Sequence, residues 1–200
     1  MSDTMPLPAR IAQTLAEEII RGDHDPGARL GQDQLAQRFA CSHVPVREAL
    51  AQLVAMELAT TAPRRGVRVA EVTPEDHRDI LDMRLALEPL AVSLAAARVT
   101  PQQLERIEAL RQDCDAAQEA IGWERANRAF HMAILTPSNR PRLLQTVEGL
   151  QRLSARHFHS KWRESWVRKS DAEHHAIVQA MSHGDGASAS AILRRHLARG

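Results

Sequence analysis

The sequence predicts a mostly α-helical protein, with a small N-terminal domain over residues 1–72 and an all-α helical bundle over residues 73–200. Three observations support this prediction. Apolar residues recur at helical spacing along most of the chain. Aromatic residues make up only 3% of the sequence, so Leu, Ala, Val and Ile must form the core, which suits helices. Strand-like alternation is confined to a stretch near residue 67.

The composition restricts the class of protein. With 44% hydrophobic residues, the 200-residue chain can bury one large core or two small ones. Every apolar run falls short of the roughly 18 residues that a membrane span needs, so we expect no membrane partner. The N-terminus lacks the apolar stretch of a signal peptide. Cys41 and Cys114 form no CxxC pair, which suits a reducing cytoplasm.

The charge of the chain excludes one way of binding nucleic acid. The formal net charge is +1, and residues 1–72 carry eight Arg and no Lys against nine acids, which gives −1. A general basic field is therefore absent from the sequence of the first domain. Any contact with DNA must come from individually positioned arginines.

The first domain contains a pattern of helices joined by tight turns. Ile11, Leu15 and Ile19 predict one helix, and a second, short helix covers about residues 31–40. The stretch "SHVPVREAL" predicts a third helix, because Ser42 suits an N-cap and Pro45 falls in the first turn, where its missing N–H is not needed. Two short helices joined by three or four residues form a helix-turn-helix, whose second helix enters the major groove of DNA.

The hairpin expected after this helix completes a winged unit. Val67 and Val69 alternate with Arg68 as in a strand, and "PRRG" predicts the turn. Arginines at the tip of such a wing reach phosphates or the minor groove.

Residues 35–69, "LAQRFACSHVPVREALAQLVAMELATTAPRRGVRV", resemble the winged helix of the GntR family, and "PVREAL" matches its usual form letter for letter. The resemblance implies that Arg47 contacts DNA, whereas Arg47 taken alone would more often pair with an acid on a solvated helix face. His43 replaces the arginine that reads a guanine in the family, so the typical operator is not expected to carry over. The residues expected to contact DNA are Arg38, Ser42, His43, Val44, Arg47, Arg64, Arg65 and Gly66.

Three histidines in the bundle, His131, His174 and His196, have spacings that suit a metal site. Asn127 and His131 are spaced i and i+4, on one face of a helix. His174 and His196 are equally far from a turn at residue 185, so antiparallel helices would place both about 15 Å from that turn. One oxygen donor and three imidazoles suit a divalent ion such as Zn²⁺ or Ni²⁺. The alternative is that these are ordinary solvated or capping histidines, because the chain has ten of them.

The bundle also resembles the ligand-binding FCD domain of the FadR subfamily of GntR regulators. The matching stretches are "RLALEPLAVSLAA", "NRAFHMAIL" and "EHHAIVQAMSHGDGASASAILRRHL". The resemblance implies that Asn127, His131, His174 and His196 hold a divalent metal ion, with neutral Asn127 replacing the usual aspartate and weakening the hold. It also implies that Arg84 and the metal together bind the carboxylate of a small organic acid, at an effector site that includes Glu88. The alternative for Arg84 is a simple i, i+4 pair with Glu88.

These expectations favour a DNA-binding transcriptional regulator, and not an enzyme. We expect a homodimer on a pseudo-palindromic double-stranded operator, acting as a repressor under the control of a small carboxylate effector. Two alternatives stay open: a regulator that senses the metal itself, and a metal-dependent hydrolase fused to a winged helix. Trp162 and Trp166, one turn apart, are expected to pack in the core or at a dimer interface rather than to stack on a ligand.

Overall fold

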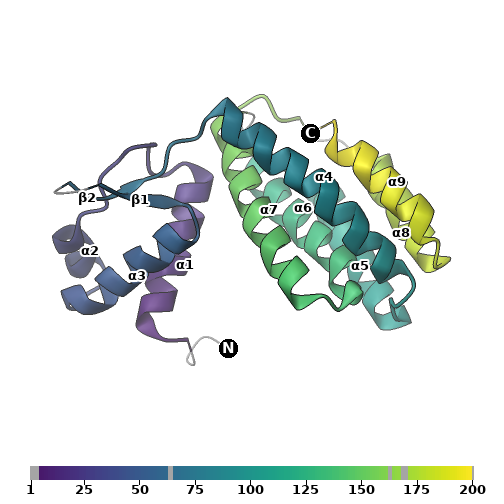
Figure 1. The fold of residues 1–200 in the computed structure, drawn as a ribbon, viewed down its shortest axis with the longest axis horizontal. Coiled ribbons are helices and arrows are strands. Elements are labelled where there is room, and N and C mark those ends of the chain that lie inside the picture. The colour runs from purple at the N-terminus through teal and green to yellow at the C-terminus, as the bar shows by residue number, and fades with distance from the viewer. Residues whose placement is uncertain (1–4, 63–64, 162–163, 168–170, 200) are drawn as a thin grey trace. The chain divides into compact units, whose positions relative to one another are not determined.

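The computed structural model describes residues 5–62, 65–161, 164–167 and 171–199, and the chain divides into two compact units, Met1–Thr73 and Pro74–Gly200 (Figure 1). The predicted fold class is confirmed: the chain is mostly helical, with one small two-stranded wing. Among these described residues, no helix is both long enough and apolar enough to span a membrane.

The first unit is built on the packing of α1 (Leu7–Arg21) against α3 (His43–Ala55), with α2 (Gln32–Arg38) beside α3. Its core contains fully buried side chains from both long helices: Ile11, Leu15, Ile19, Val46, Leu50 and Leu53. Ala40, in the turn between α2 and α3, adopts a φ of +48°, which a non-glycine residue adopts only at a cost. The turn of the helix-turn-helix therefore forms with an alanine at a positive φ, an angle that glycine adopts without strain.

The wing consists of β1 (Ala59–Ala62) and β2 (Gly66–Val69), which pair antiparallel with Ala59 opposite Val69. Arg29 forms an isolated bridge to Arg68 on the other edge of β2. The wing is therefore attached to the loop between α1 and α2.

The second unit contains six α-helices in its described part: α4 (Pro74–Ala96), α5 (Pro101–Ala116), α6 (Ala120–Leu135), α7 (Pro141–Lys161), α8 (Ala172–Ser182) and α9 (Gly186–Leu197), with a short 3₁₀ turn, η1 (Thr136–Ser138). α4 packs on α9 and α7, and α5 packs on α6 (Figure 1). Thr100 and Gln103 form the capping box that starts α5.

The turn between α8 and α9 fixes the antiparallel arrangement of these two helices. Gly184 adopts a φ of +69°, which glycine reaches without strain. A Cβ on Gly186 would lie 2.6 Å from the carbonyl oxygen of Ser93 on α4, so only glycine fits there. This close approach packs the turn of the α8–α9 hairpin against α4 and fixes the position of both helices along α4.

Candidate functional site

The start of α3 presents an exposed polar surface. Ser42, His43 and Arg47 are exposed, and 52% of the Val44 surface is exposed, while Val46 is buried in the core. Ser42 stands at the N-cap position, but its side chain makes no capping bond. Within the described residues, Arg47 has neither a hydrogen bond nor an ion pair in the structure. Its guanidinium is thus available to a partner outside the chain.

Two other residues of this surface have partners within the first unit. His43 Nε2 lies 3.3 Å from Asp33 Oδ1 at an exposed position. Arg38 donates two hydrogen bonds to Glu18, one of them 2.9 Å long, and His24 lies 2.9 Å from the same carboxylate. The hydrogen bonds from Arg38, together with His24, lower the pKa of Glu18 to about 2 despite its burial. Arg38, expected to contact DNA, therefore ties α2 to α1.

At the wing, Gly66 adopts a φ of +75° at the start of β2, and Arg65 is exposed. Arg64, also expected to contact DNA, lies outside the described residues. Arg68, on β2, donates a 2.7 Å hydrogen bond to the carbonyl oxygen of Gly27. This bond ties β2 to the loop between α1 and α2.

In the second unit, three histidines from three helices converge. His196 Nε2, on α9, lies 3.3 Å from both His131 Nε2 on α6 and His174 Nε2 on α8. One ligand atom of each residue lies within 4.8 Å of those of the other two. The structure thus brings together His174 and His196, which their spacing about residue 185 had related, and His131, which the resemblance had grouped with them.

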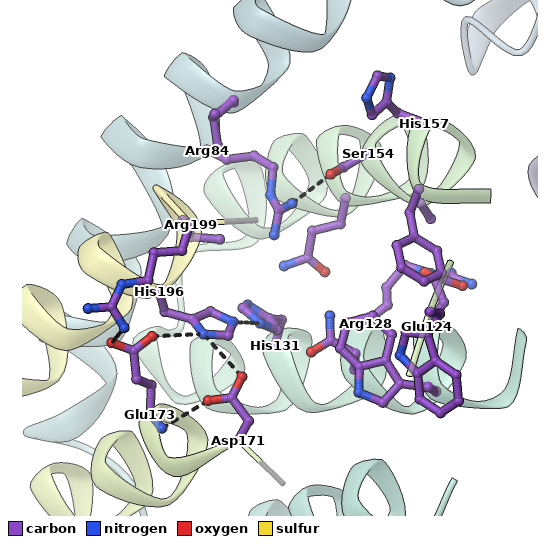
Figure 2. Close-up of a pocket in the computed structure, with 18 of the residues that line it drawn as sticks. Arg84, Glu124, Arg128, His131, Ser154, His157, Asp171, Glu173, His196 and Arg199 are labelled. Carbon is purple, nitrogen blue, oxygen red and sulfur yellow. Dashed lines mark hydrogen bonds and ion pairs between the residues drawn. The ribbon is translucent and has the colours of Figure 1, made fainter. Parts of the chain in front are cut away.

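Carboxylates orient two of these rings. Glu88 Oε2 lies 3.2 Å from His131 Nδ1. The Oδ2 of Asp171 and the Oε2 of Glu173 each lie 3.4 Å from His196 Nδ1 (Figure 2). An N–H at Nδ1 that donates to a carboxylate leaves the Nε2 lone pair of the same ring free. Both rings are therefore held in the tautomer whose Nε2 can bind a cation at the point of convergence.

The protonation of the cluster agrees with this role. Burial, reinforced by the neighbouring histidines, lowers the pKa of His174 to about 3 and that of His196 to about 4. Burial acts to raise the pKa of Glu88, but Arg84 and His131 outweigh it and hold that pKa at about 2. At neutral pH His174 and His196 are therefore neutral, which is the state in which an imidazole binds a metal ion, and the carboxylate of Glu88 is ionised.

Asn127 lies on α6, one helical turn before His131. Its Oδ1 atom is buried and has no hydrogen-bond partner among the described residues, and its side chain lines the same cavity as His131 and His196. A buried amide oxygen without a partner is costly and calls for an explanation. A cation at the histidine cluster is one such explanation.

The cavity beside the cluster has a volume of about 690 Å³ and belongs entirely to the second unit. Arg84 lines it, donating a 2.6 Å hydrogen bond to Glu88 and a 2.7 Å hydrogen bond to Ser154 on α7. Glu88 was expected to face an effector, but it is fully buried and does not line the cavity, so it supports Arg84 and His131 instead. Arg84 pairs with Glu88 and also lines the cavity, and its binding of an organic acid stays a prediction.

Several cavity residues had no signal in the sequence analysis. Asp171 precedes His174 by three positions, so its spacing could have indicated it. The rings of His77 on α4 and His157 on α7 are stacked, with 3.6 Å between their centroids. No sequence pattern relates these two positions, which are 80 residues apart. Trp166 lines the cavity rather than the core, and Trp162 lies outside the described residues. The remaining unforeseen lining residues include Trp123, Gln151, Ser154 and Phe158.

An exposed recognition helix with a wing, followed by a helical bundle that contains a cavity, is the architecture of a DNA-binding transcription regulator. Comparison with known proteins agrees. Residues 7–69 match the model for bacterial regulatory proteins of the gntR family, and residues 79–199 match the FCD domain. The chain therefore belongs to the GntR family and carries an FCD domain, which confirms the resemblance read from its motifs.

Individual relatives cover nearly the whole chain. It is 33% identical over 204 residues to the HTH-type transcriptional repressor GlaR of Escherichia coli K12, covering 92% of this chain and 89% of that protein. It is 31% identical to the HTH-type transcriptional regulator LutR of Bacillus subtilis 168, over 90% of this chain and 92% of that protein. The structure of E. coli McbR/YncC superposes with a TM-score of 0.85 at 27% identity, covering 98% and 95%. The chain is thus a DNA-binding transcriptional regulator and not an enzyme.

Proposed function

We propose that this chain is a metabolite-responsive repressor of the FadR subfamily, whose affinity for its operator is set by a small organic acid bound in a metal-containing helical domain. One observation carries the proposal: three imidazole Nε2 atoms converge on the wall of a cavity that also presents the guanidinium of Arg84. A metal ion and an arginine together hold a carboxylate by charge and by directed hydrogen bonds.

The residues present fit a first-row divalent ion such as Zn²⁺ or Ni²⁺. Nitrogen ligands at 2.0–2.1 Å from one ion lie about 3 Å from one another, and here the Nε2 atom of His196 lies 3.3 Å from those of His131 and His174. His131, His174 and His196 would hold the ion, with Asn127 Oδ1 as a neutral fourth ligand. Asp171, whose Oδ2 lies 3.7 Å from His174 Nε2, adds the negative charge that Asn127 lacks. The bound ion would supply positive charge and an open position for an oxygen of the effector.

On the DNA side, Arg47 and the exposed start of α3 would enter the major groove, with Arg65 and Gly66 of the wing beside it. We propose a homodimer, because two copies related by two-fold symmetry match a pseudo-palindromic operator. The effector would act by binding one arrangement of the dimer more tightly than the other, which is the only way a ligand shifts such an equilibrium.

The proposal is tested by metal analysis of the purified, untagged protein, followed by a thermal-shift screen of organic acids with and without a chelator. We expect about one divalent ion per chain, and an acid that raises the melting temperature only when the ion is present. His174→Ala should remove the ion, whereas His175→Ala, at an exposed neighbouring position, should retain it. Full metal content in the His174 variant would contradict the ligand set.

A second candidate function is suggested by Asn127. A neutral amide in place of a carboxylate weakens the hold on a cation, so the ion could come and go and act as the signal itself. Operator affinity measured by fluorescence anisotropy, on DNA selected by the protein from a random pool, separates the two. A sensor would respond to Zn²⁺ or Ni²⁺ alone, whereas a metabolite-responsive regulator would respond to the acid at constant metal.

A further inference from the structure

The cavity holds an unusual share of the aromatic side chains of this protein. The sequence contains only three Phe, three Trp and no Tyr. Trp123, Phe158 and Trp166 all line the cavity, and all three are half-buried. The ring centroid of Trp123 lies 5.2 Å from that of Phe158 and 6.1 Å from that of Trp166. These rings form one aromatic wall that is left open to the cavity.

The aromatic wall lies at a distance from the histidine cluster. Trp123, Asn127 and His131 are spaced i, i+4 and i+8, so they form one stripe along α6 that faces the cavity. Eight residues of α-helix correspond to about 12 Å. Figure 2 agrees, since Glu124 and Arg128 lie on the opposite side of the view from His196, Asp171 and Glu173. The cavity therefore has an end at the histidine cluster, called the cationic end because the metal ion of the proposed function would lie there, and an aromatic end.

Charge separates the two ends further. At the aromatic end, Arg128 donates a 2.9 Å hydrogen bond to Glu124, so its positive charge is balanced. At the other end, the bonds of Arg84 to Glu88 and Ser154 use Nε and Nη1, which leaves Nη2 without a bond among the described residues. Nη2 of Arg84 can therefore donate to an oxygen of a bound molecule at this end, beside the metal ion of the proposed function.

A polar side chain without a partner lies on α7, one helical turn from Ser154, the partner of Arg84. Only 3% of the Gln151 surface is exposed, it lines the cavity, and within the described residues both polar atoms of its amide lack a hydrogen-bond partner. Gln151, Ser154 and Phe158 follow one another along one face of α7 at i, i+3 and i+7. A bound molecule with a carbonyl or hydroxyl group near its middle would satisfy this amide.

We infer that the effector is an aryl-substituted organic acid, with its carboxylate at Arg84 and the histidine cluster, an oxygen substituent beside Gln151, and its ring against Trp123, Phe158 and Trp166. This inference rests on the proposed function for the acid end and adds the chemical class of the ligand. A two- or three-carbon acid would fill only the cationic end of a 690 Å³ cavity and would leave the aromatic wall unpaired. Aromatic rings gain from offset stacking beyond the area that they bury.

The test is isothermal titration of the metal-loaded, full-length protein with phenylpyruvate and cinnamate, against pyruvate and succinate. We expect phenylpyruvate to bind at least tenfold more tightly than pyruvate. Trp123→Leu should remove most of that preference and leave pyruvate binding unchanged, because leucine keeps an apolar side chain without a ring. Ile121→Ala, at an exposed position of the same helix that does not line the cavity, should leave both affinities unchanged.

Gln151→Leu provides a second, independent readout. It should weaken the binding of phenylpyruvate, because the keto oxygen of that acid would contact the amide. The affinity for cinnamate, which lacks that oxygen, should stay unchanged. Unchanged circular dichroism and metal content would show that each variant is folded.

The outcomes separate the two proposals. Metal-dependent binding of pyruvate or succinate, with no preference for the aryl acids and no effect of Trp123→Leu, overturns the aryl inference and leaves the proposed function standing. Absence of any metal-dependent acid binding overturns both.

Discussion

Glu88 on α4 and His131 on α6, 43 positions apart in the sequence, are joined by a 3.2 Å contact between Oε2 and Nδ1, and both are almost fully buried. The same carboxylate accepts a hydrogen bond from Arg84. One buried carboxylate therefore positions both the imidazole and the guanidinium that the proposed site uses.

Replacing this carboxylate should affect the metal before it affects the fold. Glu88→Gln keeps the size of the side chain but removes its charge, so His131 loses its orienting partner and Arg84 loses its counter-ion. We expect metal affinity to fall about 10- to 100-fold, measured by competition with a chromophoric chelator. Glu75→Gln, an exposed residue paired with Arg78 at the start of the same helix, is the matched control and should bind metal normally. Unchanged metal affinity in Glu88→Gln would contradict the positioning role.

Asp171 offers a test of where the negative charge of the site comes from. Its Oδ1 caps α8 by accepting from the backbone N–H of Glu173, while its Oδ2 faces His196. Asp171→Asn retains a good N-cap but removes the charge, so metal affinity should fall while the melting temperature of the metal-free protein changes little. Asp185, which caps α9 through the N–H of Ser188, is the control. Asp185→Asn should leave metal affinity unchanged, and an equal loss in both variants would assign the effect to capping.

Arg47 should carry a large share of operator affinity. Arg47→Ala removes an exposed guanidinium at the start of the recognition helix without disturbing the buried face of α3. We expect a loss of about 1–3 kcal/mol, which is roughly 5- to 150-fold in dissociation constant, measured by fluorescence anisotropy at fixed salt. Arg10→Ala, on the exposed face of α1, should bind the operator as the wild type does. If Arg47→Ala also binds normally, the assignment of α3 as the recognition helix is wrong.

The stacked pair His77 and His157 predicts a pH dependence of stability. Burial, with the charges of His77 and Lys161, lowers the pKa of His157 from its ordinary 6.5 to about 4. Between these values the unfolded chain binds a proton that the folded chain does not. The free energy of unfolding should therefore fall as the pH drops from about 6.5 to about 4, by at most about 1.4 kcal/mol per pH unit for one proton.

Urea unfolding measured at several pH values, in the presence of chelator, checks this expectation. His157→Gln should make the slope between pH 6.5 and 4 smaller, even if the variant is less stable throughout. His183→Gln, which removes an exposed histidine, should leave the slope as it is in the wild type. The same slope in His157→Gln and the wild type would show that His157 titrates normally in the folded state.

Much of this protein is encoded locally. The apolar spacing of Ile11, Leu15 and Ile19 sets the face of α1, and the capping box at Thr100 starts α5. The spacing of His174 and His196 about the turn at residue 185 indicated their meeting before any coordinates were known. Such features can be read from sequence because helix periodicity and capping depend on residues within a few positions of one another.

Other features depend on contacts between distant segments. Arg38 has the sequence context of a DNA contact, but Glu18, twenty positions earlier, binds it once α1 and α2 pack together. Glu88 has the spacing of an effector ligand with Arg84, but the packing of α4 on α6 buries it behind the cavity. The helical repeats of the sequence specify the winged unit, the bundle and the facing positions of His174 and His196. Tertiary packing settles which charged groups are paired and which face the cavity, because the burial and the partners of a side chain depend on neighbours that are distant in the sequence.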